Sequence, residues 1–375
     1  MNKKRIHLSL AHMGGGEQKY VDEAFKTNWI PIGPNIDHFE EDIANYIGEN
    51  KYVAALGTGT AALHLSLIML DIKPGDEVIC QSFTFAASAN PITYIGAKPV
   101  FVDSDETWNI SPILLEKAIV DRKRITGRYP KAIIPVYLYG MPAKIDEIMA
   151  ISERYGIPVV EDAAEALGSE FKGRKCGTFG KYGAYSFNGN KVITTSGGGA
   201  IACGTKEEAD KVKFYATQAR DNAPHYQHSQ IGYNYRTTNI AAGIGRGQME
   251  VLPQRVLQRR ANNLFYKKYL GDMNYISFQI EPNDDFYSNY WLTSIVIDPK
   301  KSNGKTREYF RLKLESENIE SRPLWKPMHL QPVFSNCPFY GDGTSEMLFE
   351  NGLCLPSGSN LSEEDLLRVI EIIKG

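Results

Sequence analysis

Short, almost wholly apolar runs alternate with amphipathic segments between about residues 51 and 203. Several of the runs carry few polar positions, as expected for strands that are buried on both faces. The runs are Tyr52–Leu56, Glu77–Cys80, Pro99–Val102, Ala132–Tyr137, Ile157–Glu161, Tyr182–Phe187 and Ala200–Cys203. Helical patterns separate them at Thr60–Leu70, Phe85–Ile95, Ser111–Val120 and Lys144–Tyr155. This β–α–β order predicts an α/β fold with a mostly parallel seven-stranded sheet flanked by helices.

The pattern changes after about residue 239. A long helical pattern runs from Asn239 towards Leu270 and contains Pro253, which is expected to kink the helix or to end one segment. Further elements are expected as a strand at 291–297, a helix at 306–317, a proline-rich run at 322–338 and a helix at 362–373 that opens with a capping box of Ser362 and Asp365. We therefore expect a large domain over residues 1–250 and a smaller C-terminal α+β domain over 251–375, with the N-terminal segment packing on the smaller one.

Charge and cysteine content narrow the classes of function. The chain has 42 Lys and Arg against 44 Asp and Glu, a net charge of −2, so nothing favours nucleic acid or an anionic membrane as a partner. Its five cysteines are widely spaced and contain no C-x-x-C pair, which fits neither a disulfide framework nor a zinc site. Residues 1–4 are basic, but no apolar run follows them, and the most apolar stretch, Ala61–Leu70, is too short to cross a bilayer. A cytoplasmic protein is expected.

A glycine turn connects the first strand to the first helix of the alternating region. Gly57-Thr58-Gly59-Thr60-Ala61-Ala62 reads as G-x-G-x-x-A, and the start of a helix after such a turn offers N–H groups to a phosphate. The motif alone does not decide between NAD and pyridoxal phosphate (PLP), and a tight turn without a ligand is the third possibility. An NAD site requires an acid at the end of the next strand, which here ends in Cys80 and Gln81, so the dinucleotide interpretation is disfavoured.

Two charged residues follow buried strands at the edge where α/β sheets bind ligands. Asp162 ends the run at 157–161, and a carboxylate buried there needs a cationic partner such as a protonated pyridine nitrogen; a helix cap or a structural ion pair is the alternative. Lys191 lies just beyond the run at 182–187, where a lysine that binds PLP would reach the ring. Phe85 can stack on a flat ring. Together, in this order, the signals indicate a PLP site.

At these residues the chain resembles the DegT-like nucleotide-sugar aminotransferases, which are fold-type-I PLP enzymes, over essentially its whole length. The stretches that carry the resemblance are Gly59–His64, Ser82–Phe85, Glu161–Gly168, Ser186–Gly199, Gly232–Arg236 and Arg322–His329. Within the family the chain is most similar to PglE-type transaminases of the UDP-N,N′-diacetylbacillosamine pathway. The resemblance implies amination at C4 of a UDP-linked 4-keto-6-deoxy-N-acetylhexosamine, with L-glutamate as the amine donor.

The resemblance also assigns residues to the cofactor. It implies a Schiff base between PLP and Lys191, a bond from the pyridine nitrogen to Asp162, stacking on Phe85, and a phosphate site at Gly59, Thr60, Ala61 and Ser186. The family completes each site across a homodimer, so Asn234 would reach the phosphate of the partner subunit. Glu165 stands near the phenolic oxygen where many relatives have Gln or His, so it would either share a proton or point away. Family members that act as dehydratases have His in place of the lysine, so Lys191 favours transamination.

Substrate residues are predicted with structural alternatives. A nucleotide sugar needs basic and aromatic groups, and the candidates are Asn28, Trp29, Arg220, Arg322, Trp325, Lys326 and His329. Arg322 could instead pair with a surface acid, and Trp325 could belong to the core. His225 and His228 form H-x-x-H without a third ligand nearby, so no metal site is expected. The alternatives to the UDP-sugar aminotransferase are a PLP-fold regulator without turnover and an aminotransferase for a dTDP- or GDP-linked keto sugar; an NAD-dependent epimerase lacks its ribose acid.

Overall fold

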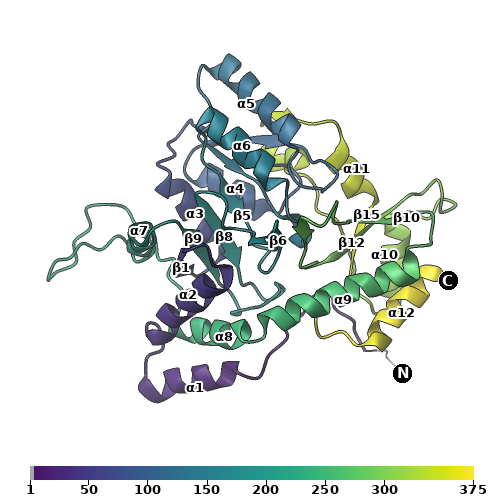
Figure 1. Cartoon of the computed structure of the whole chain (residues 1–375), viewed down its shortest axis with the longest axis horizontal. Coiled ribbons are helices and arrows are strands. Elements are labelled where there is room, and N and C mark those ends of the chain that lie inside the picture. The colour runs from purple at the N-terminus through teal and green to yellow at the C-terminus, as the bar shows by residue number, and fades with distance from the viewer. Residues whose placement is uncertain (1–3) are drawn as a thin grey trace.

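A central sheet organises the first two thirds of the chain in the computed structural model, which describes residues 4–375 (Figure 1). Its hydrogen-bonded strand order begins with β1 (Tyr52–Leu56), β9 (Gly199–Cys203), β8 (Tyr182–Ser186) and β5 (Val160–Asp162). Bridges from Ile133 to Val159 and from Val136 to Asp162 lead on to β4 (Ala132–Ile134), β2 (Glu77–Gln81), β3 (Lys98–Val102) and β14 (Phe339–Tyr340). Only β9 runs antiparallel to its neighbours. The carboxyl ends of the other strands therefore meet at one edge.

Helices cover both faces of this sheet because its strands are apolar on both sides. Val53 and Ala55 of β1 belong to one hydrophobic cluster, whereas Ala54 and Leu56 belong to the other. The first cluster packs against α2 (Pro34–Ile47), α5 (Pro112–Thr126) and α6 (Ile145–Tyr155). The second packs against α3 (Gly59–Met69), α4 (Ala86–Tyr94) and α7 (Lys206–Ala216). Helix α1 (Glu17–Thr27) lies outside this sandwich and packs on α8 (Asn239–Met249).

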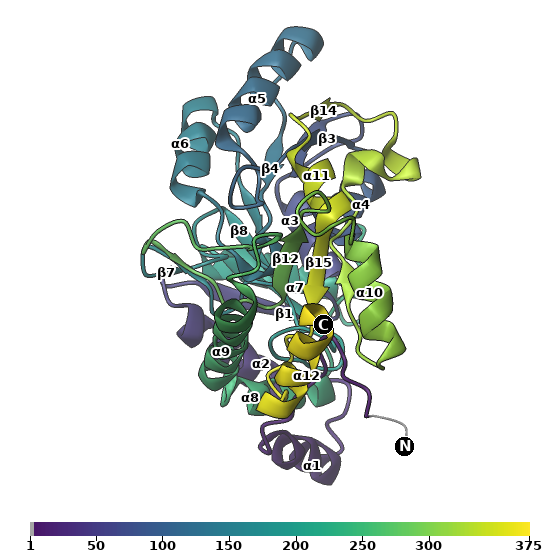
Figure 2. The ribbon, with the colours of Figure 1, turned by 90° about the vertical axis from the view of Figure 1, so that its right-hand side faces the viewer.

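A second, antiparallel sheet forms from the C-terminal part of the chain. Its order is β10 (Ile276–Phe278), β12 (Thr293–Ile297), β15 (Gly352–Leu355) and β13 (Arg322–Pro323). The helices of this region are α9 (Leu252–Leu270), α10 (Arg307–Ser316), α11 (Thr344–Asn351) and α12 (Glu363–Lys374), and a third hydrophobic cluster fills the space between α9, α10, α12 and the sheet. Figure 2 shows α9 and α12 side by side. Three short strands, β11 (Phe286–Tyr287), β6 (Glu170–Phe171) and β7 (Arg174–Lys175), connect the two parts.

Local sequence signals explain where the C-terminal helices begin. The helical pattern that starts at Asn239 is two helices, since α8 ends at Met249 and α9 starts at Leu252 with Pro253 in its first turn. Proline lacks the N–H that an interior position would need, and the first turn of a helix does not require it. The capping box of Ser362 and Asp365 is present at the start of α12.

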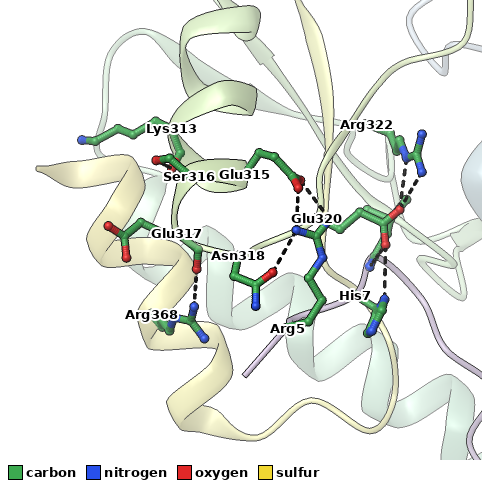
Figure 3. A network of polar contacts seen from close by, with 11 residues as sticks. Arg5, His7, Lys313, Glu315, Ser316, Glu317, Asn318, Glu320, Arg322 and Arg368 are labelled. Carbon is green, nitrogen blue, oxygen red and sulfur yellow. Dashed lines mark hydrogen bonds and ion pairs between the residues drawn. The ribbon is translucent and has the colours of Figure 1, made fainter. Parts of the chain in front are cut away.

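The N-terminal segment packs on the second sheet, although the two are far apart in the sequence. Ile6 forms a parallel bridge with Ile319 and belongs to the third hydrophobic cluster. Arg5 donates a hydrogen bond to each carboxylate oxygen of Glu315, at 2.6 and 2.9 Å (Figure 3). Glu320 accepts from the Leu8 N–H and also pairs with Arg322. Residues 1–3, which include one of the two lysines of the basic start, lie outside the described residues. Within residues 4–375, no helix combines the length and apolar character that spanning a membrane requires.

Candidate active site

A cavity of about 240 Å³ lies at the carboxyl edge of the central sheet, between that sheet and two tryptophans from the C-terminal part of the chain. It collects predicted residues from separate elements: the start of α3, the residue before α4, the end of β5 and the loop after β8. The lining residues are Thr58, Gly59, Thr60, Leu63, Thr84, Phe85, Ala87, Val136, Asp162, Ala164, Glu165, Ser186, Asn188, Asn190, Lys191, Gly197, Gly198, Trp291 and Trp325. The sheet topology therefore brings the predicted phosphate turn, acid and lysine into one space.

The phosphate end of the cavity is built by the turn before α3. Thr58 is the N-cap, and its hydroxyl accepts the Ala61 N–H at 3.0 Å. Ala61 does not line the cavity and its N–H is occupied, whereas the first-turn N–H groups of Gly59 and Thr60 have no partner inside the helix and can bind an anion. Ser186 lies against Gly59, where a Cβ atom would be 2.9 Å from the Cβ of Ser186. Glycine at position 59 lets the phosphate turn and the end of β8 approach each other.

Asp162, at the end of β5, also lines the cavity and is 4% exposed. One of its carboxylate oxygens accepts from the Ser88 hydroxyl at 2.6 Å and the other from the Ala164 N–H at 3.1 Å. Burial raises the pKa of Asp162, and these two hydrogen bonds partly oppose the rise. No ion pair of Asp162 is found within residues 4–375. A buried carboxylate that faces a cavity with lone pairs to spare fits a protonated pyridine nitrogen.

Lys191 and Glu165 form a buried ion pair in the middle of the cavity. The Lys191 Nζ atom donates to a Glu165 carboxylate oxygen at 3.1 Å and lies 4.2 Å from the centre of the Trp291 ring. The other oxygen of Glu165 accepts the Tyr139 N–H at 2.8 Å. Burial raises the pKa of Glu165 to about 7, although the Lys191 charge and the Tyr139 bond act in the opposite direction. The Glu165 side chain therefore points into the cavity, towards Lys191.

An aromatic wall closes the cavity. Phe85 is the residue before α4, lines the cavity and is 57% exposed, so its ring is available to a planar ligand. It packs against Trp325, with ring centres 5.3 Å apart. The Trp325 ring in turn contacts Trp291 and Tyr139, and the backbone N–H of Trp325 donates to the Tyr139 hydroxyl at 2.9 Å. The set of an acid, an amine, an aromatic face and a phosphate turn fits PLP.

Arg322 lies beside this cavity rather than in it. With Trp325 it lines an adjoining hollow of about 450 Å³, which shares Phe85, Asn190 and Trp291 with the cavity. Its guanidinium is 68% exposed and pairs with Glu320 at 2.9 Å.

The structure places several other predicted substrate residues away from both hollows. The His329 ring is occupied by Ser82, by Glu346 and by stacking on Phe339 with ring centres 3.6 Å apart, so it has a structural role within this chain. Arg220 covers the Tyr226 ring in the segment between α7 and α8, which projects from the body of the molecule (Figure 1). The remaining predicted substrate residues, Asn28, Trp29 and Lys326, are exposed, and so is Asn234, which is expected to reach the partner subunit's phosphate.

Two side chains of the site are absent from the sequence prediction. Ser88 lies three residues after Phe85 in the first turn of α4, so the helix period offered a signal for it. Trp291 follows a loop in the C-terminal part of the chain, and nothing in its local sequence relates it to Lys191. His225 and His228 make separate hydrogen bonds, to Gln227 and to the Gln218 carbonyl, and residues 4–375 hold no group of three or more potential metal ligands.

Comparison with known proteins agrees with this geometry. Residues 12–374 match the DegT/DnrJ/EryC1/StrS aminotransferase family. The chain is 50% identical to EpsN of Bacillus subtilis (strain 168), whose name describes a pyridoxal phosphate-dependent aminotransferase, over 99% of this chain and 95% of the relative. It is 36% identical to the GDP-perosamine synthase of Caulobacter vibrioides, over 98% and 96%. A crystal structure of a DegT DnrJ EryC1 StrS aminotransferase from Brucella abortus superposes with a TM-score of 0.89 at 31% identity, over 96% and 94%. The chain therefore belongs to the DegT/DnrJ/EryC1/StrS family and is a pyridoxal-phosphate-dependent sugar aminotransferase.

Proposed function

We propose that the enzyme transfers the amino group of L-glutamate to C4 of a UDP-linked 4-keto-6-deoxy-N-acetylhexosamine. The observation that carries the proposal is the cavity in which the Lys191 amine, the Glu165 carboxylate and the buried Asp162 face one another. The resemblance to PglE-type members at Ser196–Ala200, Gln218–Arg220 and Arg322–His329 supports the UDP-linked sugar. The name of the GDP-perosamine synthase relative supports a nucleotide sugar more broadly and makes a GDP-linked substrate the main competitor.

In this proposal Lys191 holds PLP covalently, Asp162 binds the pyridine nitrogen and Phe85 covers the ring. Gly59, Thr60 and Ser186 bind the phosphate directly, and Ala61 shapes the turn. When bound, PLP supplies an electron sink that lets a C–H bond next to the transferred nitrogen ionise. The Lys191 amine is then the group that moves protons at the reacting carbon. Glu165, 3.1 Å from Nζ and with a pKa of about 7, accepts and returns the lysine proton at neutral pH.

In this proposal the sugar nucleotide binds over the hollow next to the cavity. Trp325 belongs to both spaces, so it can contact the hexose while Arg322 binds the pyrophosphate. Arg322 would exchange its exposed pair with Glu320 for the more strongly charged ligand. The exposure of Asn28, Trp29, Arg220, Asn234 and Lys326 suits a homodimer in which a second subunit brings such residues, with Asn234 at the partner's phosphate, to the site. His329 supports the segment that carries Trp325.

Two further parts of the proposal concern organisation. The division into residues 1–250 and 251–375 is supported by the second sheet and the third hydrophobic cluster, although β14 returns residues 339–340 to the central sheet. The N-terminal segment is joined to the second part by Ile6. The near-neutral charge supports a cytoplasmic enzyme without nucleic-acid or membrane partners.

The test is turnover by purified enzyme with L-glutamate and a panel of UDP-, dTDP- and GDP-linked 4-keto sugars, with the products identified by mass spectrometry and NMR. We expect a 4-amino product from the UDP-linked N-acetylhexosamine with a kcat/KM at least tenfold above that of the other nucleotides. Lys191→Ala is expected to abolish both the visible absorbance of lysine-bound PLP and turnover. A preference for a dTDP- or GDP-linked sugar would overturn the substrate assignment, and a wild-type protein without the PLP absorbance would overturn the site.

A further inference from the structure

Helix α9 presents a stripe of buried polar residues to the rest of the molecule. Arg255, Arg259, Asn262, Asn263 and Tyr266 follow one another at spacings that place them on one face of the helix, and all are buried. Their side chains donate to backbone carbonyls or hydroxyls of four distant segments around Met13, Lys191, Trp291–Thr293 and Pro356–Gly358. The helix thus connects the lysine loop, the N-terminal segment and the exit of β15 by directional hydrogen bonds in addition to its apolar packing.

Arg259 is the most unusual member of this stripe. It is 1% exposed, and none of its four hydrogen bonds goes to a carboxylate. Within residues 4–375 no ion pair compensates its charge, and its Nε atom has no hydrogen-bond partner. Burial, together with the nearby charge of Arg255, lowers the pKa of Arg259 to about 9, so the guanidinium stays protonated at neutral pH. Burying a cation whose only acceptors are neutral costs folding free energy, so a contribution to stability does not explain why arginine stands at position 259.

Three of the four hydrogen bonds of Arg259 go to groups in or next to the lysine loop, and the fourth goes to the Ser357 carbonyl at 3.3 Å. Its Nη2 atom donates to the Lys191 carbonyl at 3.2 Å and to the Ser9 hydroxyl at 3.0 Å, and its Nη1 atom donates to the Trp291 carbonyl at 2.6 Å. Ser9 in turn donates to the Asn190 carbonyl at 2.8 Å, and the Trp291 ring N–H donates to the same carbonyl at 2.7 Å. Both carbonyls of the Asn190–Lys191 segment are therefore held by one connected network.

We propose that Arg259 is a positioning residue that fixes the backbone of Lys191 and Trp291 relative to each other, so that the lysine amine is held over the indole ring and against Glu165. The inference rests on the proposed catalytic role of Lys191. The planar guanidinium can bind three segments at once, whereas the single ammonium of lysine cannot reproduce that fork. Since a shift of 1 Å in a reacting group can slow a reaction about 10²-fold, the network has consequences for chemistry and not only for stability.

The experiment compares Arg259→Lys and Arg259→Met with Arg255→Met, all as PLP-loaded full-length enzyme. Arg255 is the matched control, because it is buried one turn earlier on the same face and donates to Met13 and Gln258 instead of to the lysine loop. Two properties are measured for each variant: the PLP dissociation constant, from quenching of tryptophan fluorescence, and the single-turnover half-reaction with L-glutamate, normalised to bound PLP. Ser9→Ala, which removes one link of the network, serves if the Arg259 variants do not fold.

For both Arg259 variants we expect the PLP dissociation constant to rise at least fivefold and the maximal half-reaction rate to fall about 10- to 100-fold. The glutamate concentration at half-maximal rate should stay within about twofold, because glutamate is not a ligand of the network. Arg255→Met should lower thermal stability yet keep both properties within twofold of wild type. The inference would be overturned if the Arg259 and Arg255 variants gave equal PLP dissociation constants and equal half-reaction rates. If the Arg259 variants do not fold, an unchanged half-reaction rate in Ser9→Ala would overturn it. Failure of the proposed function has a different signature, since wild-type enzyme would then lack lysine-bound PLP altogether.

Discussion

Replacing Glu165 with Gln tests whether the carboxylate next to Lys191 changes its protonation state near neutral pH. Gln keeps the shape of the side chain and a carbonyl oxygen that can accept from Tyr139 or Lys191, but it cannot ionise. The pKa of Glu165 rises from 4.5 to about 7 on folding, chiefly through burial. At about 1.4 kcal/mol for each pKa unit, ionising this group costs the folded protein about 3 kcal/mol relative to the unfolded chain.

The direction in which stability changes with pH follows from where the proton binds more tightly. The folded protein holds the Glu165 proton more tightly, so its contribution to stability is complete below pH 4.5 and is lost as the pH rises to about 7. The difference in unfolding free energy between wild type and Glu165→Gln should therefore fall by about 3 kcal/mol between pH 4.5 and pH 8.

Urea unfolding of the cofactor-free proteins, followed by tryptophan fluorescence at intervals of half a pH unit, measures this difference. Glu364→Gln makes the same chemical change at an exposed position of α12 and should give a difference that is flat over the same range. A flat profile for Glu165→Gln as well would refute the reasoning, because it would mean that folding does not raise the pKa of Glu165.

Two other substitutions test the acid in the cavity and the packing behind the turn before α3. Asp162→Asn keeps an acceptor for the Ser88 hydroxyl but removes the negative charge. We expect lysine-bound PLP still to form, while the half-reaction with glutamate, measured by stopped flow, slows about 10²-fold. A rate within twofold of wild type would contradict the assignment of Asp162 to the pyridine nitrogen. Gly199→Ala would force a Cβ atom against the Thr58 carbonyl and the Gly59 N–H. We expect the unfolding free energy measured in urea to fall by about 1–3 kcal/mol and PLP binding to weaken. In the control Gly204→Ala the nearest atom to the new Cβ is 3.6 Å away, so the unfolding free energy should stay within about 0.5 kcal/mol of wild type.

Local sequence predicts the part of the site that lies at strand ends. Asp162 and Lys191 could be found because each follows an apolar run, and runs of that kind form parallel strands whose carboxyl ends converge. Gly59 and Thr60 could be found because a glycine turn before a helix offers N–H groups to a phosphate, and the later Asp162 and Lys191 signals favour PLP as its source.

Other features could not be found because they depend on tertiary contacts. Arg259 stands in Gln258-Arg259-Arg260, which looks like the solvated side of a helix, and only the packing of α9 buries it. His329 lies in a stretch that resembles the family's substrate segment, yet Phe339 and Glu346 occupy its ring. Strand β14 has two residues and no periodicity, so its place beside β3 was not predictable.

Strand β14 has a practical consequence for engineering. Phe339 and Tyr340 supply the edge next to β3, although the chain reaches them only after it has built most of the second sheet. A fragment that stops near residue 250 would leave β3 as a bare edge with unpaired amides, which invites association with other chains. Chimeras that exchange C-terminal halves between relatives would replace this edge together with Trp291, Arg322 and Trp325. Such exchanges should keep residues 339–340 matched to their native neighbour.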